Sequence, residues 1–358
     1  MNEYVLNMQQ VSVGSKRCKN ILSIENFAVR PGELVAVLGP NGAGKSTLLR
    51  TINLLQPYRG EMQLFGQDIR NANKTLLRRR SALVFQETLL LDDNVFNNVA
   101  RVLKFRGTPT HKIKQKVHTA LETFGCDHLA NRSARSLSGG EAKRVCIACG
   151  LVADSELLLL DEPSASLDVG IRAQMIEKIR QWAEARRSAV ILVSHNFTDI
   201  LHFAERAIAL FNGRIVQDDK LEMLIRRPAN EQLARLVGMD NIIPCQVERS
   251  NRDYWIKLAN GVGFLYPGEV KTPITACCLS GDAFYLDDTS SLAQHQPSSV
   301  MIEGLVERVL HGIGTYTIWV KVGEQTLIAR VPRSHISNNV HRHQPIKLGF
   351  NPTDAHFI

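Results

Sequence analysis

Short, continuous apolar runs separated by segments of helical period dominate the first part of the chain. Three of them are LVAVLG at residues 34–39, LLLLD at residues 157–161 and AVILVSH at residues 189–195. Parallel strands that are buried on both faces of a sheet show this pattern. Residues 92–136 carry no strong strand signal and are typical of helices. We therefore expect an α/β domain over residues 1–237, with an inserted helical subdomain at about 88–150.

The pattern changes at about residue 240, where apolar and polar residues begin to alternate. The stretch TYTIWVKVGEQTLIARV at residues 315–331 alternates on both sides of Gly323, which predicts a β-hairpin. The runs NIIPCQV, DYWIKLA and PITACCL predict further short strands. Residues 238–358 should therefore form a second, β-rich domain, and a helical segment at residues 218–239 should join it to the first.

Length and composition agree with a two-domain protein that works inside the cell. A chain of 358 residues exceeds what one compact core usually holds. Hydrophobic residues make up 44% of it, yet no apolar run approaches the roughly 20 residues that span a bilayer. The first residues, MNEYVLNMQQ, lack the basic flank and the apolar stretch of a signal peptide. We expect a cytoplasmic location.

The basic charge could indicate nucleic-acid binding and the cysteines a redox or metal site, but the distribution of these residues along the chain favours neither. The formal net charge of +8 would fit a nucleic-acid partner, but the basic residues are dispersed. Their densest cluster, residues 78–80, contains no aromatic residue, so a solvated or partner-docking face is favoured and no nucleic acid is expected. The CxxC pair Cys146 and Cys149 could mark a redox or metal site. It stands alone in an apolar, helical stretch, which favours reduced, packed thiols.

The segment GPNGAGKST has the GxxxxGK[ST] pattern of a phosphate-binding loop. A predicted strand precedes it and a predicted helix follows it, as that loop requires. Its glycines let backbone N–H groups approach the phosphates of a nucleotide, Lys45 can reach the β- and γ-phosphates, and Ser46 can ligate Mg²⁺. The predicted nucleotide-binding residues of the segment are Gly39, Pro40, Asn41, Gly42, Ala43, Gly44, Lys45, Ser46 and Thr47.

Polar residues also end the other predicted strands. Asp161 and Glu162 follow the leucine run, so Asp161 is a candidate ligand of Mg²⁺ and Glu162 a candidate general base for an attacking water. His195 and Gln86 each end another strand that we expect in the same sheet. Because open α/β sheets bind ligands at the carboxyl ends of their strands, all four side chains should belong to one site.

With the stretch LSGGE at residues 137–141 added, the sequence resembles the ATP-binding subunits of ABC transporters. Six motifs occur in order between about Met8 and Gly238: GPNGAGKST, VFQ, LSGGE, LLLLDEP, SASLD and VSH. The resemblance implies ATP hydrolysis with Mg²⁺, for which Glu162, His195 and Gln86 would be the catalytic residues. It also implies that Gln86 contacts the metal together with Ser46 and Asp161.

The resemblance further implies an assembly. Two chains would meet head to tail, so that Ser138, Gly139 and Gly140 of one chain bind the γ-phosphate held by Lys45 of the other. Asp168 would lie at the dimer seam. Two transmembrane permease subunits and an extracytoplasmic solute-binding protein would complete an importer, which places this chain at the cytoplasmic face of the membrane.

Three positions depart from the family pattern. Glu141 replaces a common glutamine, and Cys149 stands where an arginine is usual. The family also stacks an aromatic residue on adenine, whereas the corresponding region here reads VGSKRCKN. We expect Lys16 or Arg17 to cover the base instead, because cationic side chains can stack on planar rings.

The tail resembles the small OB-like β domain, called TOBE, that ends many importer ATPases. Some oxyanion importers bind their cargo there. Together with the residues around VFQ, this favours an inorganic oxyanion, tungstate or molybdate, as cargo; sugar, iron and polyamine remain the alternatives. A soluble, non-transport ABC ATPase would need a long coiled-coil insertion or two tandem cassettes, and the sequence shows neither. Glu162 and His195 argue against a non-hydrolysing regulator.

Overall fold

The computed structural model describes residues 3–14, 21–165, 167–250, 253–270, 273–286, 299–335 and 340–358. It divides the chain into two compact units, Met1–Leu224 and Ile225–Ile358. The division precedes the boundary at residue 237 that we expected. The short helix α9 (Glu231–Leu236) consequently belongs to the second unit.

A six-stranded sheet forms the centre of the first unit, in the order β10-β9-β3-β8-β7-β6. Its strands are β3 (Leu34–Leu38), β6 (Ser81–Val84), β7 (Leu157–Asp161), β8 (Ala189–Val193), β9 (Arg206–Phe211) and β10 (Arg214–Lys220). Neighbouring strands are parallel except β9 and β10. Every residue of β7 and β8 is buried, which confirms the prediction from their continuous apolar runs.

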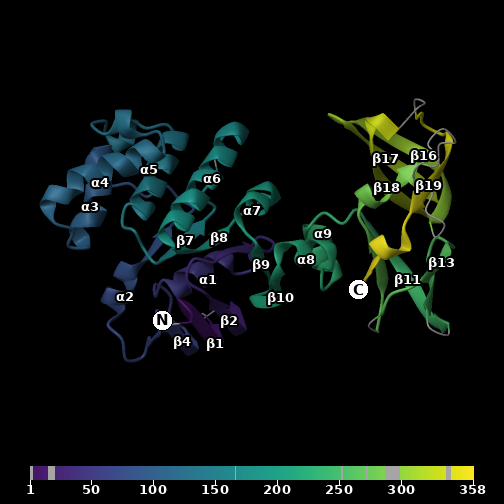
Figure 1. Ribbon diagram of the computed structural model, residues 1–358, viewed down its shortest axis with the longest axis horizontal. Helices are drawn as coiled ribbons and strands as arrows, with labels where there is room; N and C mark the ends of the chain where they lie inside the picture. Colours follow the sequence, from purple (N-terminus) through teal and green to yellow (C-terminus); the bar gives the residue numbers. More distant parts are fainter. Residues whose placement is uncertain are drawn as a thin grey trace. The chain divides into compact units, whose positions relative to one another are not determined.

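A second sheet of the first unit was not predicted from the sequence. It has the order β2-β1-β4-β5, with β1 (Leu6–Val13), β2 (Leu22–Val29), β4 (Arg59–Leu64) and β5 (Gln67–Asp68). Helix α1 (Lys45–Ile52) lies between the two sheets (Figure 1), and its side chains Leu48, Leu49 and Ile52 belong to their common core. The pairing of β1 with β4 shifts register beside Gln10, whose φ is 50°. This bulge interrupts the alternation of apolar and polar residues from which a strand could have been predicted.

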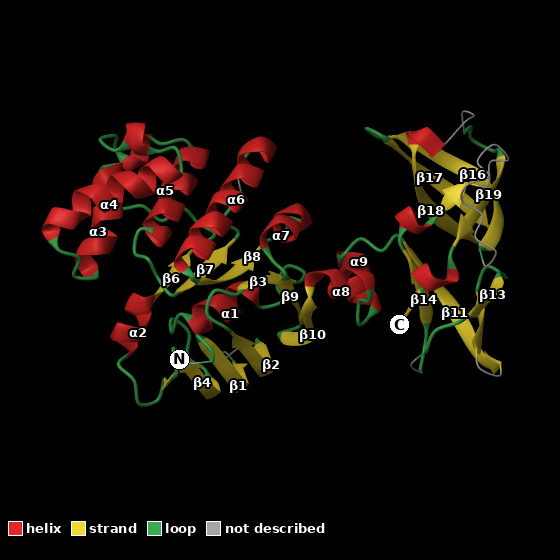
Figure 2. Cartoon of the chain, viewed as in Figure 1, coloured by secondary structure: helices red, strands yellow, loops and turns green. Residues whose placement is uncertain are grey.

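Three helices form a layer of their own in the first unit, as Figure 2 shows. They are α3 (Val95–Phe105), α4 (Thr110–Thr123) and α5 (Gly139–Leu151), and they lie within the stretch where we expected the helical subdomain. Helix α2 (Lys74–Arg80) precedes β6, while α6 (Val169–Arg186) and α7 (Phe197–Phe203) follow β7 and β8. Within the described ranges, no helix has both the length and the apolar character that crossing a membrane requires.

The expected helix over residues 218–239 is wrong in its first part and interrupted in the rest. Strand β10 continues to Lys220, because Asp218 pairs with Ile208 of β9 and its carboxylate binds the Arg206 guanidinium at 2.7 Å. Two short helices follow, α8 (Leu221–Arg226) and α9. Pro228 stands between them, and proline disfavours the helical conformation of the residue before it.

The second unit is β-rich, as predicted. Its two five-stranded antiparallel sheets have the orders β13-β12-β11-β14-β20 and β15-β19-β16-β17-β18. The first contains β11 (Asn241–Ser250), β12 (Asp253–Leu258), β13 (Gly263–Tyr266), β14 (Ala276–Leu279) and β20 (His356–Phe357). The second contains β15 (Tyr285–Leu286), β16 (Val300–His311), β17 (Thr315–Val322), β18 (Gln325–Pro332) and β19 (Pro345–Phe350).

The two sheets of this unit share one core. Phe264 of β13 meets Phe350 of β19 edge to face, with ring centroids 5.4 Å apart. The hairpin predicted around Gly323 is confirmed, since β17 and β18 pair from Thr315 with Pro332 to Val322 with Gln325.

Candidate active site

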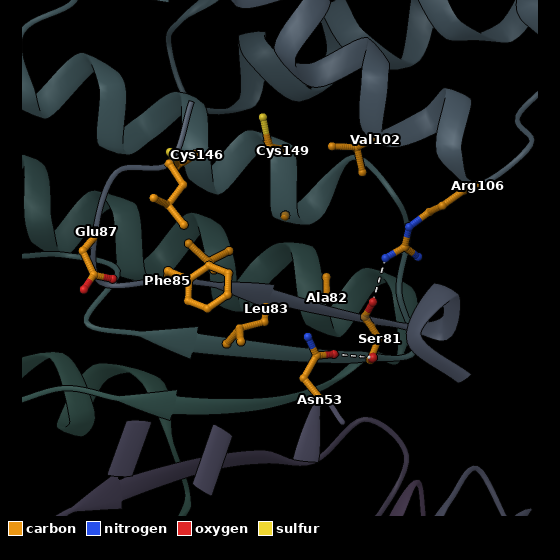
Figure 3. Close-up of a pocket in the computed structure, with 13 residues that line it drawn as sticks. Asn53, Ser81, Ala82, Leu83, Phe85, Glu87, Val102, Arg106, Cys146 and Cys149 are labelled. Carbon is orange, nitrogen blue, oxygen red and sulfur yellow. Dashed lines mark hydrogen bonds between the residues drawn. The ribbon is translucent and has the colours of Figure 1, made fainter. Parts of the chain in front are cut away.

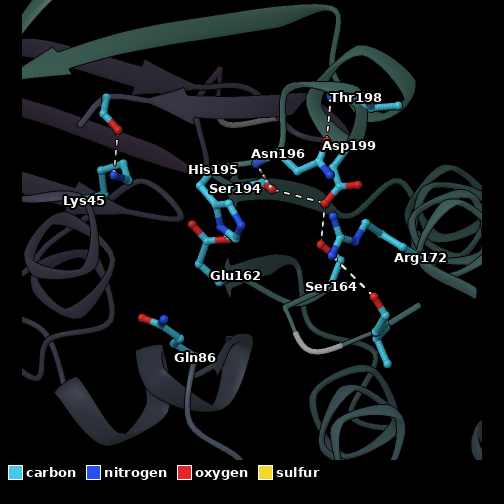
Figure 4. Close-up of polar contacts among 12 residues, drawn as sticks. Lys45, Gln86, Glu162, Ser164, Arg172, Ser194, His195, Asn196, Thr198 and Asp199 are labelled. Atoms are coloured by element: carbon cyan, nitrogen blue, oxygen red, sulfur yellow. Dashed lines mark hydrogen bonds and ion pairs between the residues drawn. The ribbon is translucent and has the colours of Figure 1, made fainter. Parts of the chain in front are cut away.

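The carboxyl ends of four neighbouring strands bring the predicted polar residues to one edge of the central sheet. Strands β3, β8, β7 and β6 are adjacent in that order. They lead into the loop before Lys45, into His195, into Asp161 and Glu162, and into Gln86. Figure 4 shows Glu162 and His195 directed at one another, with Gln86 nearby. The topology therefore joins side chains that lie far apart in the sequence.

The phosphate-binding loop needs glycine for two reasons. Gly39 has a φ of 154°, and a Cβ there would lie 2.2 Å from the carbonyl oxygen of Leu210 on β9. Gly44 has a φ of 103° and occupies the position before helix α1. The loop consequently passes close to β9 and turns directly into α1. The first N–H groups of that helix have no partner within it, so they are available to an anion.

Lys45 lies folded against this loop. Its Nζ donates to the carbonyl oxygens of Gly39 at 2.7 Å and of Pro40 at 2.9 Å, and only 8% of the residue is exposed. Burial lowers the pKa of Lys45, while the charges of Glu162 and Asp161 oppose that shift. The ammonium group therefore stands between the loop and the two acidic residues.

Asp161 offers an unpaired anionic oxygen next to Ser46. It ends β7, it is 4% exposed, and its Oδ1 atom is buried without a hydrogen-bond partner. Burial raises the pKa of Asp161, whereas a hydrogen bond with Ser46 and the charge of Arg50 lower it. A hydroxyl and a carboxylate oxygen suit Mg²⁺, which binds few protein oxygens and keeps water and phosphate ligands. The described residues contain no group of three His, Cys, Asp or Glu side chains that would enclose a metal without such ligands.

Glu162 and His195 form a direct pair. The Glu162 carboxylate lies 2.6 Å from Nδ1 of His195, and the side chains are 9% and 63% exposed. The buried glutamate thus orients an accessible imidazole whose Nε2 is not used in this contact. Glu162 itself has a φ of 49°, and its N–H donates to the carbonyl oxygen of Val193 at 2.9 Å.

A buried aspartate that the sequence analysis missed ties the two sides of this pair together. The Oδ2 atom of Asp199, on α7, accepts hydrogen bonds from the hydroxyls of Ser164 and Ser194, the latter at 3.1 Å. Ser164 follows Glu162 and Ser194 precedes His195, so one carboxylate fixes both segments (Figure 4). The sequence signal for a buried Asp199 was its place directly before Ile200, an apolar residue that is also buried on α7.

Gln86 is exposed, but its main chain is anchored by a second residue that the analysis missed. Lys143 of α5 is 2% exposed, and its Nζ donates to the carbonyl oxygens of Gln86 at 2.8 Å and of Phe85 at 3.1 Å. Helical period places Lys143 on the same face as Ile147 and Leu151, both fully buried apolar residues. A lysine on that face was the signal.

The stretch Ser138–Gly140 begins helix α5. Ser138 is the N-cap, and Glu141 completes a capping box by accepting from the Ser138 N–H at 2.8 Å. The departure at Glu141 therefore keeps a local function. Gly139 and Gly140 form the first turn, and nothing lies within 4 Å of a Cβ built at Gly139. Within the described part of the chain, these residues make no hydrogen bond to the phosphate-binding loop of the same chain.

The remaining predicted positions take different places. Asp168 is exposed and stands as the N-cap position of α6. Lys16 and Arg17, which we expected at the adenine, lie outside the described residues. Cys146 and Cys149 are free thiols, and burial raises the pKa of both. This agrees with packed cysteines.

Comparison with known proteins extends the resemblance. The family described as ABC transporter matches residues 22–165. The molybdate/tungstate import ATP-binding protein WtpC of Pyrococcus horikoshii is 38% identical over 220 residues, which are 61% of this chain and 63% of that protein. The chain thus spans less than two thirds of this relative. WtpC of Pyrococcus abyssi is 34% identical over 269 residues, which are 75% of this chain and 76% of that protein.

Two other similarities bear on cargo and fold. The spermidine/putrescine import ATP-binding protein PotA of Legionella pneumophila is 35% identical over 230 residues, 63% of this chain and 62% of that protein. An ATP-binding cassette solved as a dimer in a post-hydrolysis state with ADP and Pi superimposes with a TM-score of 0.57 at 25% identity. The superposition covers 60% of this chain and 98% of that one. The chain belongs to the family of ABC transporter ATP-binding proteins.

Proposed function

We propose that this chain binds and hydrolyses ATP as the energising subunit of an importer for an inorganic oxyanion of the molybdate and tungstate class. The observation that carries the hydrolytic role is the 2.6 Å contact between Glu162 and His195 at the ends of adjacent strands. The names of the WtpC relatives support the cargo.

In this proposal each polar residue of the sheet edge has one task. The loop and Lys45 hold the β- and γ-phosphates of ATP. Glu162 accepts a proton from the water that attacks the γ-phosphorus, and the bond from that phosphorus to the bridging oxygen of ADP breaks. His195, oriented through Nδ1, binds the γ-phosphate with the other side of its ring. Inorganic phosphate and ADP leave.

Mg²⁺ fits the oxygens that the site presents. When bound, it would neutralise phosphate charge and favour the departure of ADP. Ser46 and Asp161 would hold it, since the unpaired Oδ1 of Asp161 lacks any other partner. Gln86, at the end of β6, would be its third protein contact.

The site becomes complete only in a head-to-tail dimer. Ser138, Gly139 and Gly140 lie at the start of α5, and among the described residues they make no hydrogen bond to their own phosphate-binding loop. A similar cassette is solved as a dimer. In the proposed dimer, the N–H groups of this turn and the Ser138 hydroxyl bind the γ-phosphate of the partner chain.

A groove next to Gln86 is the proposed docking place for a helix of a permease subunit. In the dimer, each of the two chains would bind one of the two permease subunits in this way. The groove has a volume of about 320 Å³, and its lining includes Phe85, Glu87, Leu89 and Val102 (Figure 3). Leu89 is 64% and Leu91 52% exposed, which is more than apolar side chains on a free surface usually are. In this proposal the chain lies at the cytoplasmic face of the membrane, and a solute-binding protein delivers cargo from the other side. Phe96 is not part of this proposed docking face, since its ring packs on His118, with ring centroids 5.8 Å apart.

The cargo is tested with the cognate solute-binding protein, which is to be identified from the neighbouring genes. Calorimetric titration should show tight binding of tungstate or molybdate. The similarity to PotA makes a polyamine the second candidate, and sugar and iron complete the comparison. Tight binding of spermidine or a sugar, without binding of tungstate, molybdate or sulfate, would contradict an oxyanion cargo and leave the ATPase role untouched.

A further inference from the structure

A buried ammonium group crosses from the helix that begins with Ser138 to the segment that carries Gln86. Lys143 is 2% exposed, and Nζ donates to two consecutive carbonyl oxygens, those of Phe85 and Gln86. A lysine chain that is ordered and removed from water costs free energy, so these charged hydrogen bonds must compensate for it. Burial lowers the pKa of Lys143, while negative charges nearby, including those of Asp161, Glu162 and Glu87, oppose that shift and favour the charged ammonium.

The same segment runs beside the next turn of α5. Cys146, which stands three residues after Lys143 on α5, lines one groove together with Phe85, Glu87 and Leu89. Figure 3 shows Cys146 on its helix above the segment that runs from Phe85 to Glu87. Residues 85–89 therefore lie along α5, and the hydrogen bonds of Lys143 hold the end that carries Gln86. No acidic side chain of the described residues takes part in these two bonds.

We propose that Lys143 is a positioning residue: by holding the main chain at Gln86, its ammonium group keeps the Gln86 side chain within reach of the metal at Ser46 and Asp161. This rests on the proposed function, in which Gln86 contacts Mg²⁺. It follows that a displacement of α5, which carries Ser138 toward the partner chain, moves Gln86 as well. The contact of Ser138 with the partner chain's phosphate and the contact of Gln86 with the metal are then linked through the Lys143 side chain.

Hydrogen exchange of the full-length chain tests the anchor without any activity measurement. In Lys143→Met, amides of residues 85–89 should exchange about tenfold faster than in the wild type, because two charge-assisted bonds are lost. Lys143→Arg keeps a charged donor and should exchange within about twofold of the wild type. Lys114→Met, a change of an exposed lysine on α4, is the matched control. Unchanged exchange in Lys143→Met would overturn the proposal; if that variant does not fold, Lys143→Gln is measured in the same way.

The metal dependence of hydrolysis tests the consequence. Lys143→Met should raise the Mg²⁺ concentration for half-maximal ATPase by about tenfold, as the loss of support around a metal site often does, with Mg²⁺-free ATP binding unchanged. Adding Gln86→Ala should cause little further change, because both act on one contact. Additive effects, or weaker Mg²⁺-free ATP binding, would show a general structural role and overturn the proposal. A normal Mg²⁺ requirement in Gln86→Ala alone would instead refute the metal role of Gln86, and the exchange result would still decide whether Lys143 anchors the segment.

Discussion

Glu162 combines two properties that rarely occur together, burial and a left-handed backbone. A φ near 49° in a residue with a side chain costs on the order of 1 kcal/mol or more, so the surroundings must stabilise it. The pairing of Asp161 with Val193 and the bond from the Glu162 N–H to Val193 do so. The chain turns at the end of β7, and the glutamate meets His195 rather than following Asp161 along the strand.

We predict that Glu162→Gln slows ATP hydrolysis by roughly 10² to 10⁴ while ATP still binds, because an amide cannot accept the proton of the attacking water. The variant should also accumulate as an ATP-bound dimer. Steady-state ATPase assays and gel filtration with ATP measure both effects. Glu177→Gln, at an exposed position of α6, serves as the control. Turnover within threefold of the wild type would remove Glu162 from the base role.

Sequence reasoning found the residues that stand in short motifs and missed those that act across the fold. Gly39 and Lys45 belong to one loop, so their spacing alone identifies them. Lys143 binds carbonyl oxygens 57 and 58 residues away, and Asp199 binds a hydroxyl 35 residues away. Such contacts depend on how elements pack, which no local spacing records. The only sequence signals of these contacts were the helical period around Lys143 and the place of Asp199 directly before Ile200.

At the scale of elements, one side chain of α3 binds the main chain of the turn between β6 and α3 near its second end. Asn98 of α3 is 6% exposed; its Oδ1 accepts from the Leu91 N–H at 2.7 Å, and its Nδ2 donates to the carbonyl oxygens of Leu91 at 3.1 Å and Asn94 at 2.9 Å. Leu91 can remain exposed because its main chain is fixed in this way. The main chain of the proposed docking segment is therefore held at Leu91 although the leucine side chain faces outward.

Removing this amide should destabilise the first unit. Asn98→Ala leaves the Leu91 N–H without its partner and removes one of the two donors to the Leu91 carbonyl oxygen, which also accepts from the Asp93 N–H at 2.8 Å. We expect this to lower the free energy of unfolding by about 1–3 kcal/mol. Asn98→Asp retains only the acceptor and should lose part of that amount. Denaturant unfolding followed by circular dichroism measures it, with the exposed Asn26→Ala on β2 as the control. A loss below about 0.5 kcal/mol would mean that water replaces these bonds.

The exposed leucines of the same turn should contact the permease. A cysteine at Leu90, between the exposed Leu89 and Leu91, should cross-link to a cysteine in the cytoplasmic helix of a co-expressed permease subunit. The expected readout is a heterodimeric band on a non-reducing gel. Lys114→Cys on α4 controls for non-specific reaction. If no nucleotide state gives the Leu90→Cys cross-link, these leucines serve the packing of the helical layer and not docking.

The fold as a whole could be predicted where buried apolar runs are long. The prediction failed where such runs are interrupted. Strands β7 and β8 were predicted from continuous apolar residues. The sheet β2-β1-β4-β5 was not predicted, because the bulge at Gln10 interrupts the pattern of β1. In the first unit, Ser138 is the N-cap of α5 in the helical layer, whereas Lys45 begins α1 between the two sheets. The proposed head-to-tail pair would combine these two parts from different chains in one site.

Mixing two inactive variants tests this division of the site. In a heterodimer of Lys45→Ala with Ser138→Arg chains, one site receives the intact Lys45 and the intact Ser138, and the other receives both defects. ATPase should reappear, up to about a quarter of the wild-type rate under random pairing with independent sites. Lys45→Ala mixed with Glu162→Gln is the matched control, because both residues belong to the same chain's half of the site and every site of that heterodimer is damaged. Recovery in the control pair, or none in the test pair when each site can work alone, would show that Ser138 does not complete the partner's site.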